Sequence, residues 1–465
     1  MQKKWAIIPA VIIVLGGVWI GGAWYTGKQI EQNYPERIAA INQNKFLQIE
    51  NVKFQRHFFS SEMQYEVKIG DKSFPVQSNI YHGPFPTNML SHLSFQPLIA
   101  SAETTVIKNQ QTEPFFKLFS KEQPLLLTTN VGYQQQFNLN LDISSGKLQT
   151  EKEQAKWSDS QFQFTLDKDK NIHYRAALKH LDLNIAPEPY AKPTQVLLDE
   201  FDTQGDLQLT NWQYLPIGKG TTSLKLFQLS QSLSENVLAT VTYQDPVSNF
   251  EFSKNGDFYA IKGDSTIKDF LINQQSLFSQ KSKIELNHLQ GDALVKIIDA
   301  SLENNQPAFE QALQTVLMNH PQLIIEPLQA YNSHGKFALN TNIQLANANF
   351  KQVLNRGKIE EIFDKFTFSL ILDKDFQKQY IANLIKISFS NAQYPEKTVN
   401  EQKLQDTQND IQRLLQEQVA KGILTETDKS YELNFEQREG KFYLNQQEIP
   451  KEVLLFGLLQ LFAGF

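Results

Sequence analysis

Apolar and polar residues alternate over much of the sequence, and this two-residue period constrains the fold more than any other feature. Residues two positions apart point to the same face of a β-strand, so alternation gives a strand one apolar and one polar face. The pattern is clearest at residues 137–143, 162–166, 337–345, 431–435 and 442–444. Aromatic residues favour a half-buried pleated surface, which suits the 33 Phe and 15 Tyr among the 465 residues. The pattern predicts a long antiparallel sheet.

Two stretches have helical spacing instead. Residues 291–319 carry apolar side chains at intervals of three and four, with Pro307 where a second helix would begin and Pro321 just after its end. Residues 401–421 have one apolar face, and Gly422 follows as a plausible C-terminal cap. Both stretches are predicted to be amphipathic helices laid against the sheet.

The N-terminal region contains one long uncharged run. Residues 5–25 carry no charged side chain, and two lysines and the amino terminus precede them. A helix of these 21 residues would be about 31 Å long, close to the hydrocarbon thickness of a bilayer. The positive-inside rule then places the N-terminus in the cytoplasm and the rest of the chain on the far side. We predict a membrane anchor whose interfacial aromatic residues are Trp5, Trp19, Trp24 and Tyr25.

A cleaved signal peptide is the alternative to an anchor, because Gly21, Gly22 and Ala23 form a small-residue triplet that a signal peptidase accepts. The uncleaved anchor is favoured, because the apolar run is long for a signal peptide and no polar segment precedes Ala23. Gly17 and Gly21 have the spacing that lets two membrane helices pack closely, which predicts a homodimer. Glycine is common in membrane helices, so an unpaired helix stays the alternative.

Composition removes several classes of function. Lys plus Arg number 44 and Asp plus Glu 50, a net charge of −6 that does not suit nucleic-acid binding. The absence of cysteine excludes disulfides, thiolate metal sites and cysteine nucleophiles. The eight histidines lack the i, i+4 spacing of a helical zinc site, and no serine lies in a G-x-S-x-G turn. We therefore expect no metal and no cofactor, name no catalytic residue, and favour a non-enzymatic protein.

These patterns together predict an α+β, mainly β fold: a long antiparallel β-rich periplasmic body with a few amphipathic helices, preceded by one transmembrane helix. The predicted parts are a cytoplasmic tip (residues 1–4), the anchor (5–25), a helical stalk (26–45), a β-rich region (46–290) and a helix-plus-strand region (291–465).

Several short strings resemble a bacterial envelope family usually called YdgA-like. They are Gly21-Gly22-Ala23-Trp24-Tyr25-Thr26-Gly27-Lys28, His57-Phe58-Phe59-Ser60-Ser61, His82-Gly83-Pro84-Phe85, Gly422-Ile423-Leu424, residues 431–435 and Gly440-Lys441-Phe442-Tyr443-Leu444-Asn445. Two positions depart from the family: Gln446 stands where glycine is common, and His57 where a small residue is usual. The resemblance implies a self-associating, inner-membrane-anchored periplasmic protein of a Gram-negative bacterium, of unknown molecular function, and implies no catalytic residues.

The string His82-Gly83-Pro84 also has a physical interpretation of its own. Glycine before proline is a turn signal, so the string is predicted to end one strand and redirect the chain, with His82 hydrogen-bonded across the turn. The alternative is that His82 lies exposed on a loop tip and contacts a ligand or a partner.

Three classes of function stay open. A continuous Phe/Leu face must be covered by helices, by a second sheet or by something amphiphilic, which favours a protein that binds an apolar ligand or handles lipid. Residues 289–294 resemble segments of AsmA-like envelope proteins, which have one N-terminal anchor and a long β-rich periplasmic body that shuttles lipid. The alternatives are a self-associating structural scaffold and, ranked last, an envelope-acting hydrolase with converging carboxylates or a His–carboxylate pair in a pocket.

Overall fold

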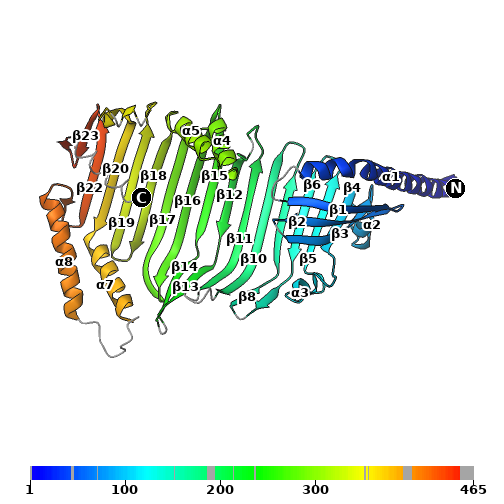
Figure 1. Ribbon diagram of the computed structural model, residues 1–465, viewed down its shortest axis with the longest axis horizontal. Helices are drawn as coiled ribbons and strands as arrows, with labels where there is room; N and C mark the ends of the chain where they lie inside the picture. The colour runs from blue at the N-terminus through cyan, green and yellow to red at the C-terminus, as the bar shows by residue number, and fades with distance from the viewer. Residues whose placement is uncertain are drawn as a thin grey trace. The chain divides into compact units, whose positions relative to one another are not determined.

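The computed structural model describes the backbone of residues 3–42, 47–70, 72–150, 152–185, 194–212, 214–234, 237–349, 352–353, 356–390 and 401–450. Side chains are described from Trp19 onward in these ranges, except at 232–234, 237–238, 359, 388–390 and 401–404. The chain forms two compact units, residues 1–181 with 202–206 and residues 182–201 with 207–465. Strands dominate both units (Figure 1) and pair antiparallel, which confirms the predicted mainly β fold.

The first unit begins with one long helix and continues as a meander of strands. Helix α1 (Lys3–Ile41) is followed by β1 (Leu47–Arg56), β2 (Ser60–Ile69), β3 (Lys72–His82), α2 (Thr87–Ser91), β4 (Leu98–Val106), α3 (Glu113–Phe116), β5 (Leu125–Gly132), β6 (Phe137–Ile143), β7 (Gly146–Gln149), β8 (Glu153–Trp157), β9 (Ser160–Leu166) and β10 (Asn171–Ile185). The sheet order is β1-β2-β3-β4-β5-β6-β9-β10, and β7 and β8 form a hairpin between β6 and β9 in the chain.

The alternation of the sequence appears directly in the register of this sheet. Leu139 of β6 lies opposite Phe164 of β9, and Phe164 lies opposite Tyr174 of β10. The same offset places Leu141 opposite Phe162. A shift of one residue would turn all of these side chains to the polar face, so the apolar pattern fixes the register.

The second unit is a longer sheet with helices packed against it. It contains β11 (Thr194–Gln208), β12 (Ile217–Ser223), β13 (Leu226–Ser234), β14 (Val237–Gln244), β15 (Val247–Asn255), β16 (Phe258–Ile272), β17 (Gln275–Gln290), α4 (Gly291–Leu302), α5 (Gln306–Leu317), β18 (Gln322–Asn332), β19 (Gly335–Leu345), η1 (Ile359–Glu361), β20 (Phe363–Asp373), α7 (Lys374–Ser390), α8 (Glu401–Ala420), β21 (Thr425–Glu426), β22 (Ser430–Arg438), β23 (Lys441–Leu444) and β24 (Gln447–Ile449). Residues 202–206 of β11 belong to the first unit.

Strand β16 organises the second unit. One edge of β16 pairs with β17, while its other edge pairs first with β15 and then with β14. Beyond β17 the order continues as β18-β19-β20-β22-β23-β24. Beyond β14 it continues through β13 to β11, and beyond β15 to β12.

Helices cover two ends of one face of this sheet. The predicted helices at 291–319 are α4 and α5, and they bury Ala293 and Val316 against a cluster formed by Trp212, Tyr259 and Leu289. Helix α7, which the sequence pattern did not predict, packs against β17, β19 and β20. Helix α7 begins at Lys374, directly after β20 ends at Asp373, so no turn sequence between them indicates the start of a helix. The predicted helix at 401–421 is α8, and Gly422 after it has the expected positive φ of 71°. Helix α8 packs against α7, whereas the sequence pattern predicted that it would lie on the sheet.

The two compact units and the predicted regions of the chain are divided at different places. Residue 290 is the N-cap of α4 inside the second unit, whereas the units separate within β10 and β11. Residues 43–46 of the predicted stalk and 451–465 of the last predicted region lie outside the described residues. No helix among the residues from Trp19 on with described side chains is long and apolar enough to cross a membrane. Most of the predicted span at 5–25 lies before those residues.

The start of α4 gives a test of the core of the second unit. A Cβ added to Gly291 would overlap the indole ring of Trp212, whose Nε1 donates to Asp292 Oδ1 at 2.8 Å. We expect Gly291→Ala to cost about 2 kcal/mol through overpacking and to lower the midpoint of thermal unfolding followed by circular dichroism. Gly263→Ala is the matched control, because its Cβ would meet only Asn249 O at 3.7 Å. Equal midpoints for the two variants would contradict the packing of α4 on Trp212.

Candidate functional site

Three of the strings singled out in the sequence meet where α1 lies on the sheet of the first unit (Figure 1). We call this region the docking node. It comprises residues 19–27 of α1, the β1–β2 turn at residues 57–59, Ser61 of β2 and residues 82–85 at the end of β3. Helix α1 contacts β1, β2 and β3, so a single helix packs across the first three strands.

His82 lies at the centre of the docking node. Its Nε2 is 2.8 Å from Ser61 Oγ, its Nδ1 is 3.2 Å from Phe58 O, and its backbone N–H donates to Phe59 O at 2.9 Å. Both His82 and Ser61 are 1% exposed. His82 therefore does not lie exposed on a loop tip, which was the alternative interpretation of this string. His82 is buried because α1, which is distant in sequence, packs over the turn that follows β3.

Small residues of α1 make that cover fit closely. A Cβ on Gly27 would overlap the His82 ring, and one on Gly22 would lie 2.8 Å from Pro84 Cδ. Ala23 is completely buried. Gly21, in contrast, has open space where a Cβ would be, so it faces away from the sheet. Gly17 lies among the residues whose side chains are not described.

The predicted interfacial aromatic residues have different surroundings. Trp19 donates from Nε1 to Phe85 O at 3.0 Å and stacks on Phe59 with ring centroids 5.1 Å apart. Trp24 and Tyr25 are exposed, and the Trp24 ring lies 5.9 Å from the Arg56 guanidinium. Trp5 lies among the residues whose side chains are not described.

Gly83 and Pro84 hold the loop after β3 against β4. The Gly83 N–H donates to Ile99 O at 2.8 Å, and a Cβ on Gly83 would overlap the Leu98 carbonyl oxygen. The Leu98 N–H donates to Pro84 O at 2.9 Å, which closes the loop of residues 84–98. Glycine is therefore required here by the close approach of a neighbouring backbone.

Burial lowers the pKa of His82 below its ordinary value of 6.5. Repulsion from Arg56 and His57 acts in the same direction, while the acceptor oxygens of Phe58 and Ala23 oppose it. The net effect is a neutral imidazole at neutral pH, which shares one hydrogen bond with Ser61 and one with a backbone carbonyl.

The hydrogen bond between Ser61 and His82 has the geometry of a nucleophile and its base, but its surroundings do not suit catalysis. Both side chains are covered by α1, and the second ring nitrogen faces a carbonyl oxygen instead of a carboxylate. Two His–carboxylate pairs, His173 with Asp206 and His320 with Asp364, lie on exposed strand or loop positions. No group of metal-ligating side chains occurs in the described part of the chain.

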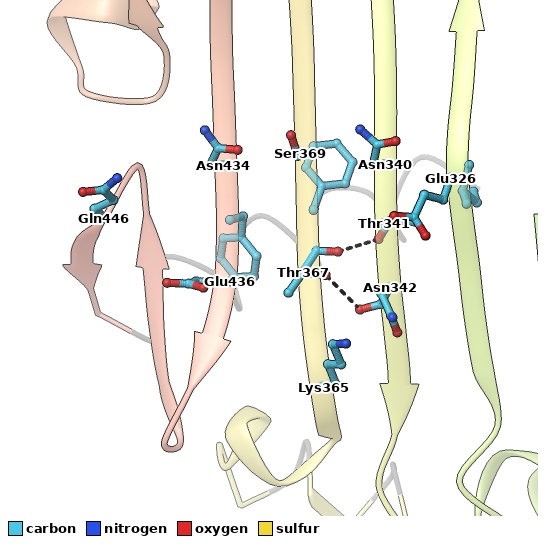
Figure 2. A pocket seen from close by; sticks show the side chains of 13 residues that line it. Glu326, Asn340, Thr341, Asn342, Lys365, Thr367, Ser369, Asn434, Glu436 and Gln446 are labelled. Carbon is cyan, nitrogen blue, oxygen red and sulfur yellow. Dashed lines mark hydrogen bonds between the residues drawn. The ribbon is translucent and has the colours of Figure 1, made fainter.

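Sheet surfaces in both units carry cavities. One of about 450 Å³ opens over β18, β19, β20 and β22, and Figure 2 shows its row of polar side chains from Asn340 through Ser369 to Asn434. The other, of about 570 Å³, lies beside the irregular pairing of β1 and is lined by Lys53, Tyr65 and neighbours. Neither contains a His–carboxylate pair among its lining residues.

The second unit carries a row of aromatic rings across four strands. Phe227 of β13 lies opposite Tyr243 of β14, which lies opposite Phe270 of β16, which lies opposite Phe278 of β17. Successive ring centroids are 5.8, 5.1 and 4.8 Å apart. We call these four residues the aromatic ladder. It ends at Tyr380 of α7, 6.2 Å from Phe278.

The aromatic ladder is partly exposed along its length. All four rings have intermediate exposure. Two further apolar side chains of the same face, Leu229 and Ile284, are 38% and 39% exposed. The alternating residues of the second unit thus form a half-open apolar surface between α4–α5 and α7. The ladder has no signal in the sequence, because each ring lies in a different strand and only the register aligns them.

The fold defines a class: an antiparallel β-sheet protein whose N-terminal helix docks on the first strands. A family model described as a bacterial protein of unknown function (DUF945) matches residues 1–452, and the chain belongs to this family. Protein YdgA of Escherichia coli strain K12 is 25% identical over 382 residues, 74% of this chain and 75% of that protein. An uncharacterized protein of Haemophilus influenzae is 26% identical over 314 residues, 64% of this chain and 86% of that protein. The YdgA-like resemblance is thereby confirmed.

The close fit of Gly27 against His82 can be tested within α1. We expect Gly27→Val to displace the helix from the docking node, because the new side chain would occupy the space of the imidazole. Amide hydrogen exchange of residues 19–27 should then accelerate. Gly21→Val places the same side chain on the same helix facing open space, and its exchange should match the native chain. Equal exchange in both variants would contradict the docking.

The lowered pKa of His82 makes docking depend on pH. The unfolded chain takes up the His82 proton near pH 6.5, before the docked state does, so stability is full above that value and falls as the pH drops below it. We expect the unfolding midpoint to decrease from pH 7 to pH 5 by more in the native chain than in His82→Gln. Parallel pH profiles for the two proteins would show that His82 does not titrate as inferred.

Proposed function

We propose that this chain is a non-enzymatic protein of the bacterial envelope, anchored in the inner membrane by its N-terminal helix, whose periplasmic body binds a lipid acyl chain on the aromatic ladder. The observation that carries the proposal is the half-open apolar surface of the second unit. Four adjacent rings, together with Leu229 and Ile284, stay partly exposed on one sheet face.

Physical chemistry favours an apolar occupant for this surface. Burying apolar area contributes about 25 cal/mol per Å², so a row of partly exposed rings is stabilised when an apolar group covers it. Lys262 and Asp264 of β16 lie opposite Glu285 and Lys283 of β17, an odd number of residues from Phe278, so these charged side chains point to the face away from the ladder. An unbranched acyl chain suits a row of rings without charges, because it needs no hydrogen-bond partner.

The packing of α1 supports an uncleaved anchor. Cleavage after Ala23 would remove the hydrogen bond of Trp19 to Phe85 O, the stack on Phe59 and the buried Ala23 side chain. These contacts connect the uncharged N-terminal run to the first sheet through one continuous helix. The proposed orientation, with the N-terminus in the cytoplasm, follows from the lysines before the run.

Self-association through α1 is the second candidate role, and one observation favours it. Gly21 is exposed and faces open space, while the neighbouring Gly22 packs against Pro84. This side of the helix therefore leaves room for the close approach of a second helix.

Photocrosslinking tests the ladder. The full chain in mild detergent is given a phospholipid with a photoreactive group on its acyl chain, and the labelled peptides are identified by mass spectrometry. We expect labels on β13, β14 and β16. Phe270→Asp should reduce them about tenfold, the equivalent of about 1.4 kcal/mol of lost binding.

The matched control is Thr266→Asp, which places the same charge on the same strand at an exposed residue of the opposite face. It should label like the native chain. Labelling that avoids these strands, or that falls equally in both variants, would contradict acyl-chain binding at the ladder.

A further inference from the structure

Exposed apolar side chains gather on the loops of the docking node. Phe58 of the β1–β2 turn is 48% exposed, and the loop of residues 84–98 exposes Phe85 (36%), Leu93 (81%) and Phe95 (69%). A patch of this kind on a protein surface indicates a contact with another apolar phase. We call these four residues the loop patch.

Both loops that carry the patch contact Trp19, so they lie beside the same turn of α1. Trp19 stacks on Phe59, the neighbour of Phe58, and donates to the carbonyl of Phe85 itself. The rest of the loop is held in place by backbone bonds, from Leu93 N to Leu90 O at 3.0 Å and from Leu98 N to Pro84 O at 2.9 Å. Figure 1 shows α2, which lies within this loop, at the same end of the sheet as the N-terminal part of α1.

These loops carry almost no charge. Residues 84–98 contain no Asp, Glu, Lys or Arg, and neither do residues 57–61. The titratable side chains within them are two histidines, His57 and His92. Moving these segments out of water therefore removes no permanently charged group from its hydration shell.

The length of α1 before Trp19 sets how close the loops lie to the membrane. Residues 5–18, the 14 residues of the uncharged run before Trp19, would span only about 21 Å at 1.5 Å per residue. The hydrocarbon core of a bilayer is about 30 Å thick, so the span needs roughly 9 Å more, which is the length of residues 19–24. Those residues are the part of α1 packed on the loops through Trp19, Gly22 and Ala23.

We infer that the docking node lies at the periplasmic boundary of the hydrocarbon core, with residues 19–24 of α1 inside that boundary, and that the loop patch, Phe58, Phe85, Leu93 and Phe95, inserts into the lipid beside α1. This inference rests on the proposed anchor. It assigns the patch to a lipid surface because Trp19 of the uncharged run contacts both loops that carry the patch, and because aromatic side chains concentrate at membrane interfaces. The first unit is then held by the helix and by its own loops together.

Spin labelling of the full chain tests the inference, and the natural absence of cysteine gives a clean background. The variants Leu93→Cys and Phe95→Cys carry a nitroxide label and are reconstituted in vesicles of phosphatidylethanolamine and phosphatidylglycerol. Relaxation by dissolved oxygen reports lipid, and relaxation by a water-soluble nickel chelate reports water. We expect oxygen to exceed the nickel chelate at both positions.

Two control variants report a position expected in water and a position expected in lipid. Ile69→Cys labels an exposed residue at the other end of β2, nine residues from Ser60 and so about 30 Å away, and the nickel chelate should dominate there. Ile12→Cys labels the middle of the uncharged run and tests the anchor itself.

The outcomes separate the two proposals. Lipid signals at Ile12→Cys with water signals at Leu93→Cys and Phe95→Cys would overturn the inserted patch and leave the anchor. Labels at 93 and 95 that neither reagent reaches would mean that a protein surface covers the patch, and would overturn lipid insertion as well. A water signal at Ile12→Cys would overturn the anchor on which the inference rests.

Discussion

The structure depends on the packing of side chains across neighbouring strands on one face of an antiparallel sheet. Cross-strand contacts are the unit of stabilisation in such a sheet, and each pair contributes only a fraction of a kcal/mol. In both units these pairs repeat from strand to strand, as in the run from Leu139 through Phe164 to Tyr174. Repetition along a sheet extends the structure without requiring a large closed core. It also leaves much of the apolar face only half-buried.

Helices bury parts of this apolar face, and each helix covers a different set of side chains. In the second unit α4 and α5 bury Trp212 and Tyr259, and α7 reaches the aromatic ladder at Phe278. In the first unit α1 covers His82 and Ser61 with Gly22, Ala23 and Gly27. Where no described helix provides such cover, the exposed apolar side chains are the features with functional potential. The proposed lipid contacts at the ladder and at the loop patch follow from this uneven cover.

The docking node gives the family strings a common physical basis. Glycines of α1, the Phe-Ser-Ser string and His82-Gly83-Pro84 are far apart in the sequence, yet they form one packed cluster with hydrogen bonds at 2.8–3.2 Å. Here the Ser–His pair is a buried hydrogen bond beneath α1, and it helps to hold the helix on the sheet. The strings thus describe how a helix is seated on a sheet.

The sequence by itself determined the strand pattern, the helices at 291–319 and 401–421, the uncharged N-terminal run and the family resemblance, because all of these are encoded in residues close together in the chain. Only the tertiary structure decided that His82 is buried, that Gly22 and Gly27 face the sheet while Gly21 faces open space, and that Phe227, Tyr243, Phe270 and Phe278 align. The physical reason is that burial and alignment depend on the register of strands distant in sequence and on the helix that lies over them. Local alternation selects the face of a side chain, whereas its neighbours on that face are selected by the fold.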